Sequence, residues 1–278
     1  MYKITKVKEL TKDIMLMGIE AAHVVKNCKA GNFVIVIPDE TGERIPLTIY
    51  DWDRSKNIVY IIYMVVGLST MKLAALKEGE FIYAIAGPLG RHFHVENYGN
   101  AVVVGGGVGV PAIFPMARAL RETGNKVTSI TGFRTKDLII LENEMLSVSD
   151  TVVIGTNDGS YGKKGFVTDL LKEIIASGEK INYVVAVGPV VMMKAVADTT
   201  KPYGIKTIVS LNALMLDGTG MCGGCRVTVG GKNKFSCVDG PDFDGHLVDF
   251  VELTSRLSTF KAEEKIAMDN CKIKLGGN

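Results

Sequence analysis

Four candidate metal ligands near the C-terminus constrain this chain more than any other feature. Asp217 precedes Cys222, Cys225 and Cys237 in the spacing D-x4-C-x2-C-x11-C. With cysteine at position 217, this would be the plant-type [2Fe–2S] spacing, C-x4-C-x2-C…C. Glycines lie between the candidate ligands, and glycine tolerates the positive φ that brings backbone N–H groups close to sulfur. The pattern predicts an iron–sulfur loop in which all four residues are ligands.

Two other uses of these cysteines compete with the cluster. A C-x2-C pair with a third cysteine and an aspartate can hold structural zinc, and the thiols can also be reactive or purely structural. Disulfides are not expected, because the first residues lack the apolar core of a signal peptide and five cysteines are an odd number. Cys28 and Cys271 lie outside the motif, and we expect both to be ordinary residues. Free thiols and a cluster both fit the reducing cytoplasm, which is the expected location.

Composition excludes several other classes of protein. A chain of 278 residues predicts about two domains. The longest apolar run, residues 58–66, is too short to span a bilayer, which needs about 20 residues. The formal net charge of +2 indicates neither nucleic acid nor an anionic membrane as a partner.

Residues 1–98 contain short β-rich runs separated by turn-forming residues. Such spacing favours a small antiparallel barrel. One helix is expected to interrupt it, at 70–76. The expected strands are 33–37, 46–50, 58–66 and 81–85.

Residues 99–213 alternate buried apolar strands with helical stretches, which predicts an α/β domain with a five-stranded parallel doubly wound sheet. The expected strands are 101–104, 126–131, 151–154, 183–187 and 206–209. The expected helices are 111–123, 137–146, 167–176 and 190–199. Residues 214–278 form the third segment: the iron–sulfur loop, an amphipathic helical stretch at 246–268, and a frayed tail at 275–278. The helical stretch either docks a partner or covers its own domain.

A glycine-rich turn follows the first strand of the α/β domain and opens a helix. Its residues Gly106, Gly107, Val108 and Gly109 can admit a phosphate to the backbone and the helix N-terminus. The turn lacks the third glycine of G-x-G-x-x-G, so a simple strand–helix turn stays open as an alternative. Ligands of such sheets bind at the carboxyl ends of the strands. Those ends also carry Arg134, Asp158, Gly188 and Pro189, which we expect to share a nucleotide ligand with the turn.

A barrel followed by this α/β domain resembles the ferredoxin–NADP reductase-like flavoproteins. The resemblance is carried by Arg44-Ile-Pro-Leu-Thr48, Gly67-Leu-Ser-Thr70, Gly87-Pro-Leu-Gly90 with Phe93, and the Gly105–Gly109 turn. It implies that FAD is bound by Arg44, Pro46, Leu47, Thr48, Ile49, Val65, Gly67, Ser69 and Thr70. Two positions depart from the family. The family has an arginine three residues before the Ser/Thr, where this chain has Ile45, and Leu68 replaces a residue that is commonly smaller or basic.

The segment from Cys225 to Cys237-Val-Asp-Gly-Pro241 resembles the electron-transfer subunit of type B dihydroorotate dehydrogenase, which normally has cysteine in place of Asp217. With Asp217 at this position, the segment resembles that of a sister group, the small subunits of NADH-dependent reduced ferredoxin–NADP oxidoreductase, also described as sulfide dehydrogenase. This implies FAD, a [2Fe–2S] cluster and NAD(H) rather than NADP(H) as cofactors. It also implies a larger iron–sulfur flavoprotein subunit as heterodimer partner, and ferredoxin as a redox partner of the complex.

These cofactors form a chemical series. Nicotinamide delivers two electrons as hydride, a [2Fe–2S] cluster accepts one, and flavin handles both, so flavin belongs between them. The sequence contains no pattern that requires a catalytic triad, and His92 and His94 are expected to be ordinary barrel-edge residues. The expected function is an electron-transfer oxidoreductase subunit of a flavin-based bifurcating complex. Two alternatives stay open: an electron-transfer subunit for dihydroorotate dehydrogenase B, and a zinc-stabilised nucleotide-binding module without a redox role.

Overall fold

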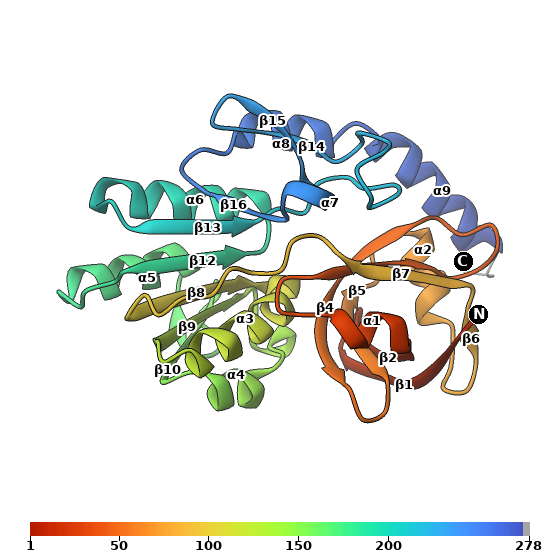
Figure 1. Cartoon of the computed structure of the whole chain (residues 1–278), viewed down its shortest axis with the longest axis horizontal. Helices are drawn as coiled ribbons and strands as arrows, with labels where there is room; N and C mark the ends of the chain where they lie inside the picture. The colour runs from red at the N-terminus through yellow and green to blue at the C-terminus, as the bar shows by residue number, and fades with distance from the viewer. Residues whose placement is uncertain (275–278) are drawn as a thin grey trace.

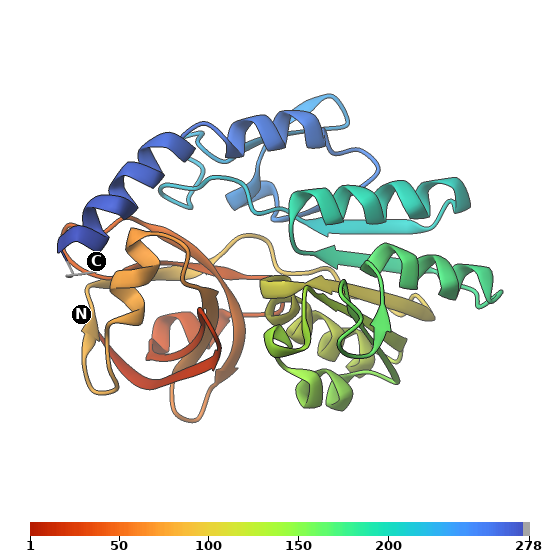
Figure 2. The same ribbon diagram turned by 180° about the vertical axis from the view of Figure 1, so that it is seen from behind.

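The computed structural model describes residues 1–274; the predicted frayed tail at 275–278 lies outside them. A curled antiparallel sheet and a parallel α/β sheet lie side by side, and the C-terminal segment crosses one side of both (Figures 1 and 2). One buried apolar cluster joins Ile35 of the first sheet, Val209 of the second, and Cys225 and Cys237 of the C-terminal segment. The segment that carries the candidate ligands is therefore packed into the core and not appended to it.

The N-terminal sheet has the strand order β6-β1-β2-β5-β4-β3-β7. Its strands are β1 Tyr2–Thr11, β2 Ile14–Glu20, β3 Phe33–Ile37, β4 Ile45–Asp53, β5 Ile58–Met64, β6 Phe81–Ile82 and β7 Ala84–Leu89. Because β6 pairs with β1 and the adjoining β7 pairs with β3, one segment of chain joins both edges and curls the sheet. Two helices accompany the sheet: α1 Ala22–Asn27 and α2 Leu68–Ala74.

The α/β sheet has the order β11-β10-β9-β8-β12-β13-β16. Its strands are β8 Asn100–Gly106, β9 Lys126–Phe133, β10 Thr151–Thr156, β11 Lys163–Lys164, β12 Tyr183–Val187, β13 Lys206–Ser210 and β16 Asp242–Asp244. The five predicted parallel strands are present, and two short edge strands extend them. One of these, β16, comes from the C-terminal segment and pairs antiparallel with β13. The chain order reverses between β8 and β12, which places the topological switch point, and so the expected ligand crevice, there.

The helices of this domain follow the prediction except near residue 140. They are η1 Gly107–Gly109, α3 Val110–Glu122, η2 Lys136–Leu138, α4 Glu142–Val148, α5 Val167–Ala176, α6 Val190–Thr200 and η3 Lys201–Tyr203. The single helix expected over 137–146 is wrong. Leu141 takes a left-handed φ of 59°, which ends the first turn and separates η2 from α4.

The C-terminal segment contains β14 Arg226–Val229, β15 Lys232–Phe235, α7 Ser236–Asp239, α8 Phe250–Leu257 and α9 Lys261–Lys274. The Asp249 carboxylate starts α8 by accepting the N–H groups of Val251 and Glu252. Helix α8 packs against α6 and β14, so it covers its own domain, while α9 lies beside α2 (Figure 1). Within residues 1–274, no helix has both the length and the apolar character that a membrane crossing requires.

Candidate functional site

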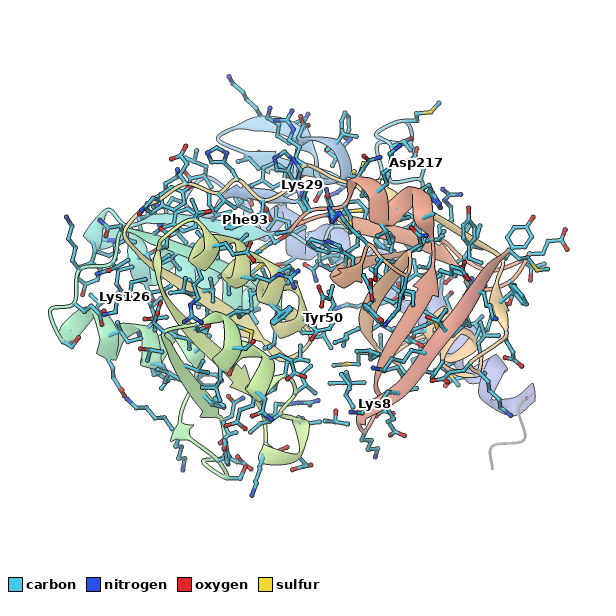
Figure 3. All side chains as sticks on the ribbon, turned by 60° about the horizontal axis from the view of Figure 1, so that its bottom comes forward. Lys8, Lys29, Tyr50, Phe93, Lys126 and Asp217 are labelled. Carbon is cyan, nitrogen blue, oxygen red and sulfur yellow. The ribbon has the colours of Figure 1, made fainter. Side chains whose placement is uncertain are left out.

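The four predicted cluster ligands lie on one loop in two pairs. The sulfur atoms of Cys225 and Cys237 are 3.1 Å apart and buried. Cys222 is exposed, and Asp217, five residues before it, is partly exposed. Figure 3 shows Asp217 on this loop beside the barrel. One pair thus faces the protein interior and the other faces the surface.

Backbone N–H groups converge on the candidate ligand atoms, as the glycine content predicts. The Gly224 amide donates to the Cys222 sulfur and the Cys237 amide to the Cys225 sulfur, both at 3.4 Å. Gly218 and Gly223 adopt φ values of 76° and 68°, a region that side chains disfavour. The loop can therefore fold tightly around its sulfur atoms.

Asp217 is held ionised by the loop that follows it. Its carboxylate accepts the Thr219 amide at 2.9 Å and the Cys222 amide at 3.0 Å. The Thr219 amide, and then the Cys222 amide, lower the pKa of Asp217. Each carboxylate oxygen has two acceptor sites, so one stays available to a metal after each backbone bond is made.

The pairwise arrangement suits a two-iron cluster, because each iron needs only two protein ligands. Burial, followed by the neighbouring Cys225 thiol, raises the pKa of Cys237, and the positive charge of a bound metal would counter this by stabilising the thiolate.

The predicted flavin-binding residues lie at the start of β4, just after β5 and at the start of α2. Ile49 is fully buried in the barrel core, whereas Pro46, Leu47, Thr48 and Val65 keep partly exposed surface. The Thr70 hydroxyl accepts the amides of Val66 and Gly67, which caps α2. Their flavin contacts stay a prediction.

Two of the predicted flavin-binding side chains have other partners in the structure. The Ser69 hydroxyl donates to the Glu43 carboxylate. The Arg44 guanidinium donates from Nε to the Leu216 carbonyl at 2.6 Å and from Nη2 to the Asp217 carbonyl at 3.3 Å. Arg44 lies just before β4, one position ahead of the site where the family has its arginine, and its side chain contacts the start of the iron–sulfur loop. That contact was not foreseen from the sequence.

The predicted nucleotide-binding glycines lie at the switch point of the α/β sheet. A Cβ at Gly109 would overlap the Val187 carbonyl group, and one at Gly106 would overlap the Met192 sulfur. Gly107 has a φ of 52° and open space beside it, so its backbone is free for a ligand. Val108, in the same turn, is exposed.

Other predicted nucleotide-binding residues follow neighbouring strands. The Asp158 amide donates to the Arg134 carbonyl at 3.3 Å, which brings the ends of β9 and β10 together. Both side chains are exposed. The Asp158 carboxylate accepts the hydroxyl and amide of Ser160, which lower its pKa. On the other side of the switch point, Gly188 and Pro189 lead from β12 into α6.

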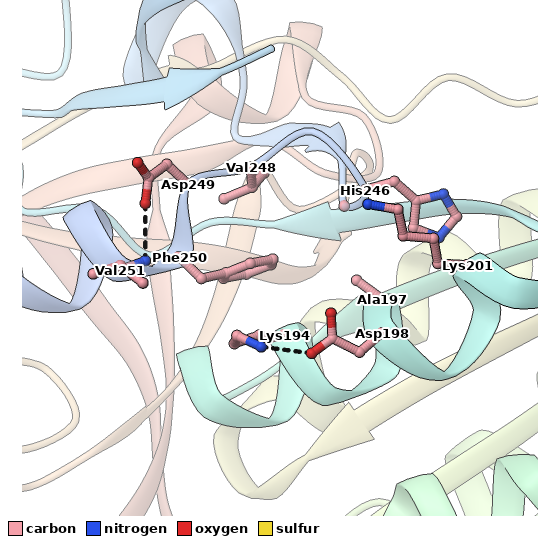
Figure 4. Close-up of a pocket in the computed structure, with 10 residues that line it drawn as sticks. Lys194, Ala197, Asp198, Lys201, His246, Val248, Asp249, Phe250 and Val251 are labelled. Atoms are coloured by element: carbon pink, nitrogen blue, oxygen red, sulfur yellow. Dashed lines mark hydrogen bonds and ion pairs between the residues drawn. The ribbon is translucent and has the colours of Figure 1, made fainter. Parts of the chain in front are cut away.

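Two cavities lie away from these predicted sites. One of about 230 Å³ lies between α6 and the start of α8, where Lys194 pairs with Asp198 (Figure 4). The other, of about 350 Å³, lies between the N-terminal sheet and helix α3. It is lined by Trp52, whose ring faces the guanidinium groups of Arg54 and Arg118, and by His92 and Phe93. Neither cavity contains a residue that the sequence predicts to bind a cofactor.

Comparison with known proteins gives consistent matches along the chain. A family model described as the iron–sulfur cluster binding domain of dihydroorotate dehydrogenase B matches residues 212–249. A Thermotoga maritima protein named dihydroorotate dehydrogenase B (NAD(+)), electron transfer subunit homolog is 43% identical over 96% of this chain and 94% of its own length. The subunit of that enzyme from Fusobacterium nucleatum is 35% identical over 84% of this chain and 92% of its own length.

Solved structures give the same result. A chain from the structure of NADH-dependent reduced ferredoxin–NADP oxidoreductase, studied for flavin-based electron bifurcation, matches with a TM-score of 0.92. It is 41% identical, and the match covers 97% of both chains. Phthalate dioxygenase reductase, at 18% identity and a TM-score of 0.60, shares the fold alone.

A curled antiparallel sheet, a parallel α/β sheet and an iron–sulfur segment together define a ferredoxin reductase-like oxidoreductase component. Within this class, the chain belongs to the family of dihydroorotate dehydrogenase B electron-transfer subunits and their homologues.

Proposed function

We propose that this chain is the electron-transfer subunit of a flavin-based bifurcating oxidoreductase, passing electrons between NAD(H), FAD and a [2Fe–2S] cluster to a larger iron–sulfur flavoprotein subunit. The observation that carries the proposal is the loop that pairs Asp217 with Cys222 at the surface and Cys225 with Cys237 in the core. The 0.92 TM-score to a chain of the bifurcating oxidoreductase supports it. Ferredoxin as a redox partner of the complex and a cytoplasmic location belong to the same proposal.

The proposed division of the chain follows the sequence. Residues 1–98 bind FAD, 99–213 bind NAD(H), and 214–278 carry the cluster and the C-terminal helices. Asp217 and Cys222 would hold one iron, and Cys225 and Cys237 the other, because the members of each pair lie close together. When bound, NAD(H) supplies hydride transfer, FAD changes two-electron to one-electron transfer, and the cluster passes single electrons onward.

The residues of the chain position these groups and control access to them. The Gly106–Gly109 turn and the N-terminus of α3 present backbone N–H groups to a nucleotide phosphate. The buried pair Cys225 and Cys237 keeps water from the inner side of the cluster site. On the outer side, Met221 is 89% and Leu216 55% exposed, so the surface beside Cys222 is apolar and open to a partner.

A second candidate function is an electron-transfer subunit for dihydroorotate dehydrogenase, which the matched family model and the names of the relatives favour. Asp217 argues against it, because the resemblance to that subfamily implies cysteine there. Dihydroorotate oxidation by the complex separates the two candidates.

Native purification under anaerobic conditions tests the proposal. The expected result is a larger co-purifying subunit and visible flavin and iron–sulfur absorption that bleaches with NADH. A colourless protein that contains zinc would overturn the redox function, and a partner that oxidises dihydroorotate would establish the second candidate.

A further inference from the structure

The turn between β3 and β4 contacts two other parts of the proposed electron path through adjacent residues. Glu43 accepts the Ser69 hydroxyl, at the predicted flavin-binding segment. Arg44 donates two hydrogen bonds to the carbonyl oxygens of Leu216 and Asp217, at the start of the iron–sulfur loop. Arg44 and Leu216 are 172 residues apart in the chain, so their hydrogen bond is a tertiary contact and not part of a local turn.

We propose that Arg44 is a positioning residue for the iron–sulfur loop, which fixes its first turn against the flavin-binding barrel and raises the reduction potential of the cluster. This rests on the proposed function. A guanidinium has several donors in one rigid plane, so it can bond two successive carbonyl groups at once, whereas a lysine ammonium is a compact point charge on a flexible stem. Holding Leu216 and Asp217 in this way fixes the backbone from which the Asp217 carboxylate projects.

The charge of Arg44 gives the direction of the effect on potential. Reduction adds one negative charge to the cluster, and a nearby positive charge stabilises the reduced form. Loss of that charge therefore lowers the midpoint potential. The same loss leaves the carbonyl groups of Leu216 and Asp217 without their donor, which loosens the loop.

Three variants of the full-length chain in its native complex separate these effects. In Arg44→Gln, we expect a lower cluster midpoint, an altered EPR spectrum of the reduced cluster, and faster amide hydrogen exchange in residues 216–222. Arg44→Lys keeps the charge and should restore most of the midpoint but not the slow exchange. The matched control is Arg54→Gln, since Arg54 also donates to a backbone carbonyl, that of Cys28, at 3.1 Å. Roughly 30 Å of strand β4 separates it from Arg44.

The outcomes are distinct. Loss of cluster iron per bound FAD in Arg44→Gln but not in Arg54→Gln supports the positioning role as firmly as a shifted midpoint does. If Arg44→Gln and wild type agree in iron content, midpoint, EPR spectrum and exchange, the inference is wrong while the proposed function stands. If the wild-type complex itself contains no iron–sulfur cluster, the proposed function fails first.

Discussion

The sulfur atoms of Cys225 and Cys237 lie 3.1 Å apart because the hairpin between them returns the chain to its starting point. Strand β14 begins just after Cys225, β15 ends just before Ser236, and Arg226 pairs with Phe235. The Ser236 amide then donates to the Cys225 carbonyl at 3.0 Å and extends the ladder. The x11 spacing in the sequence is therefore the length of a β-hairpin, and the distance between the thiols is wider than the roughly 2.05 Å of a disulfide.

Replacing either buried cysteine should abolish the cluster. In Cys225→Ser or Cys237→Ser, a thiolate ligand is lost, and we expect iron content and the EPR signal of the reduced cluster to fall to background while FAD is retained. Cys28→Ala is the matched control. Cys28 is also buried, and burial raises its pKa to about 11, but it lies outside the loop. Full iron content in both serine variants would contradict the ligand assignment.

Asp217 should tune the cluster and not merely cap the loop. Asp217→Cys is expected to retain the cluster, because the spacing then becomes that of a four-cysteine cluster, but to change its midpoint and EPR spectrum. Asp217→Ala removes the ligand and the acceptor of two backbone amides, so cluster content should drop sharply. Redox titration followed by EPR measures both. An Asp217→Cys protein with the spectrum and midpoint of wild type would show that the carboxylate does not bind iron.

Apolar patterning predicted the α/β half of the fold better than the barrel. Strands such as 183–187 are continuous apolar runs, and the structure has β12 at those residues. Strands β1 and β2 and helix α1 were not anticipated. Strand β1 contains three lysines and a glutamate and has one buried residue, so its apolar pattern is weak, and a glycine interrupts β2. Pairing with neighbouring strands stabilises both segments.

At the candidate site, the spacing of residues in the sequence predicted more of the arrangement than the chemistry of individual side chains did. Ligand spacing identified the iron–sulfur loop, and glycines identified the turn predicted to bind the nucleotide, because both patterns reflect backbone geometry within a short stretch of chain. The Arg44 contact with Leu216 and Asp217 depends on the packing of two distant segments, which no local pattern records. The cavity beside Trp52 depends in the same way on how α3 packs beside the N-terminal sheet.

The packing of α3 on β12 should limit residue 109 to glycine. In Gly109→Ala, the new methyl group would overlap the Val187 carbonyl and displace the N-terminus of α3. We expect a loss of about 1–3 kcal/mol in unfolding free energy and weaker NADH binding, with FAD retained. Gly178→Ala is the control. The φ of 82° at this position is strained for alanine, but no atom lies within 4 Å of the added Cβ, and the position is remote from the Gly106–Gly109 turn. It should lose stability by about 1–2 kcal/mol and bind NADH normally. Equal NADH affinity in both variants would refute a role for this turn in nucleotide binding.

A buried carboxyl group at the junction of the three segments should make stability depend on pH. Both carboxyl oxygens of Asp242 are buried and lack a hydrogen-bond partner, although the residue keeps some exposed surface. Burial raises the pKa of Asp242 to about 7. An unfolded aspartate titrates near 3.9.

Between about pH 4 and pH 7, the folded state therefore keeps a proton that the unfolded state has lost, and stability falls as pH rises through this window. The slope from this group approaches at most about 1.4 kcal/mol per pH unit. Asp242→Asn should remove that component and be more stable than wild type at pH 8. Asp244→Asn, which changes an exposed carboxyl on the same strand, is the control and should keep the wild-type slope. Urea unfolding at pH 5, 6, 7 and 8 measures the effect, and parallel profiles for wild type and Asp242→Asn would show that Asp242 does not titrate in this range.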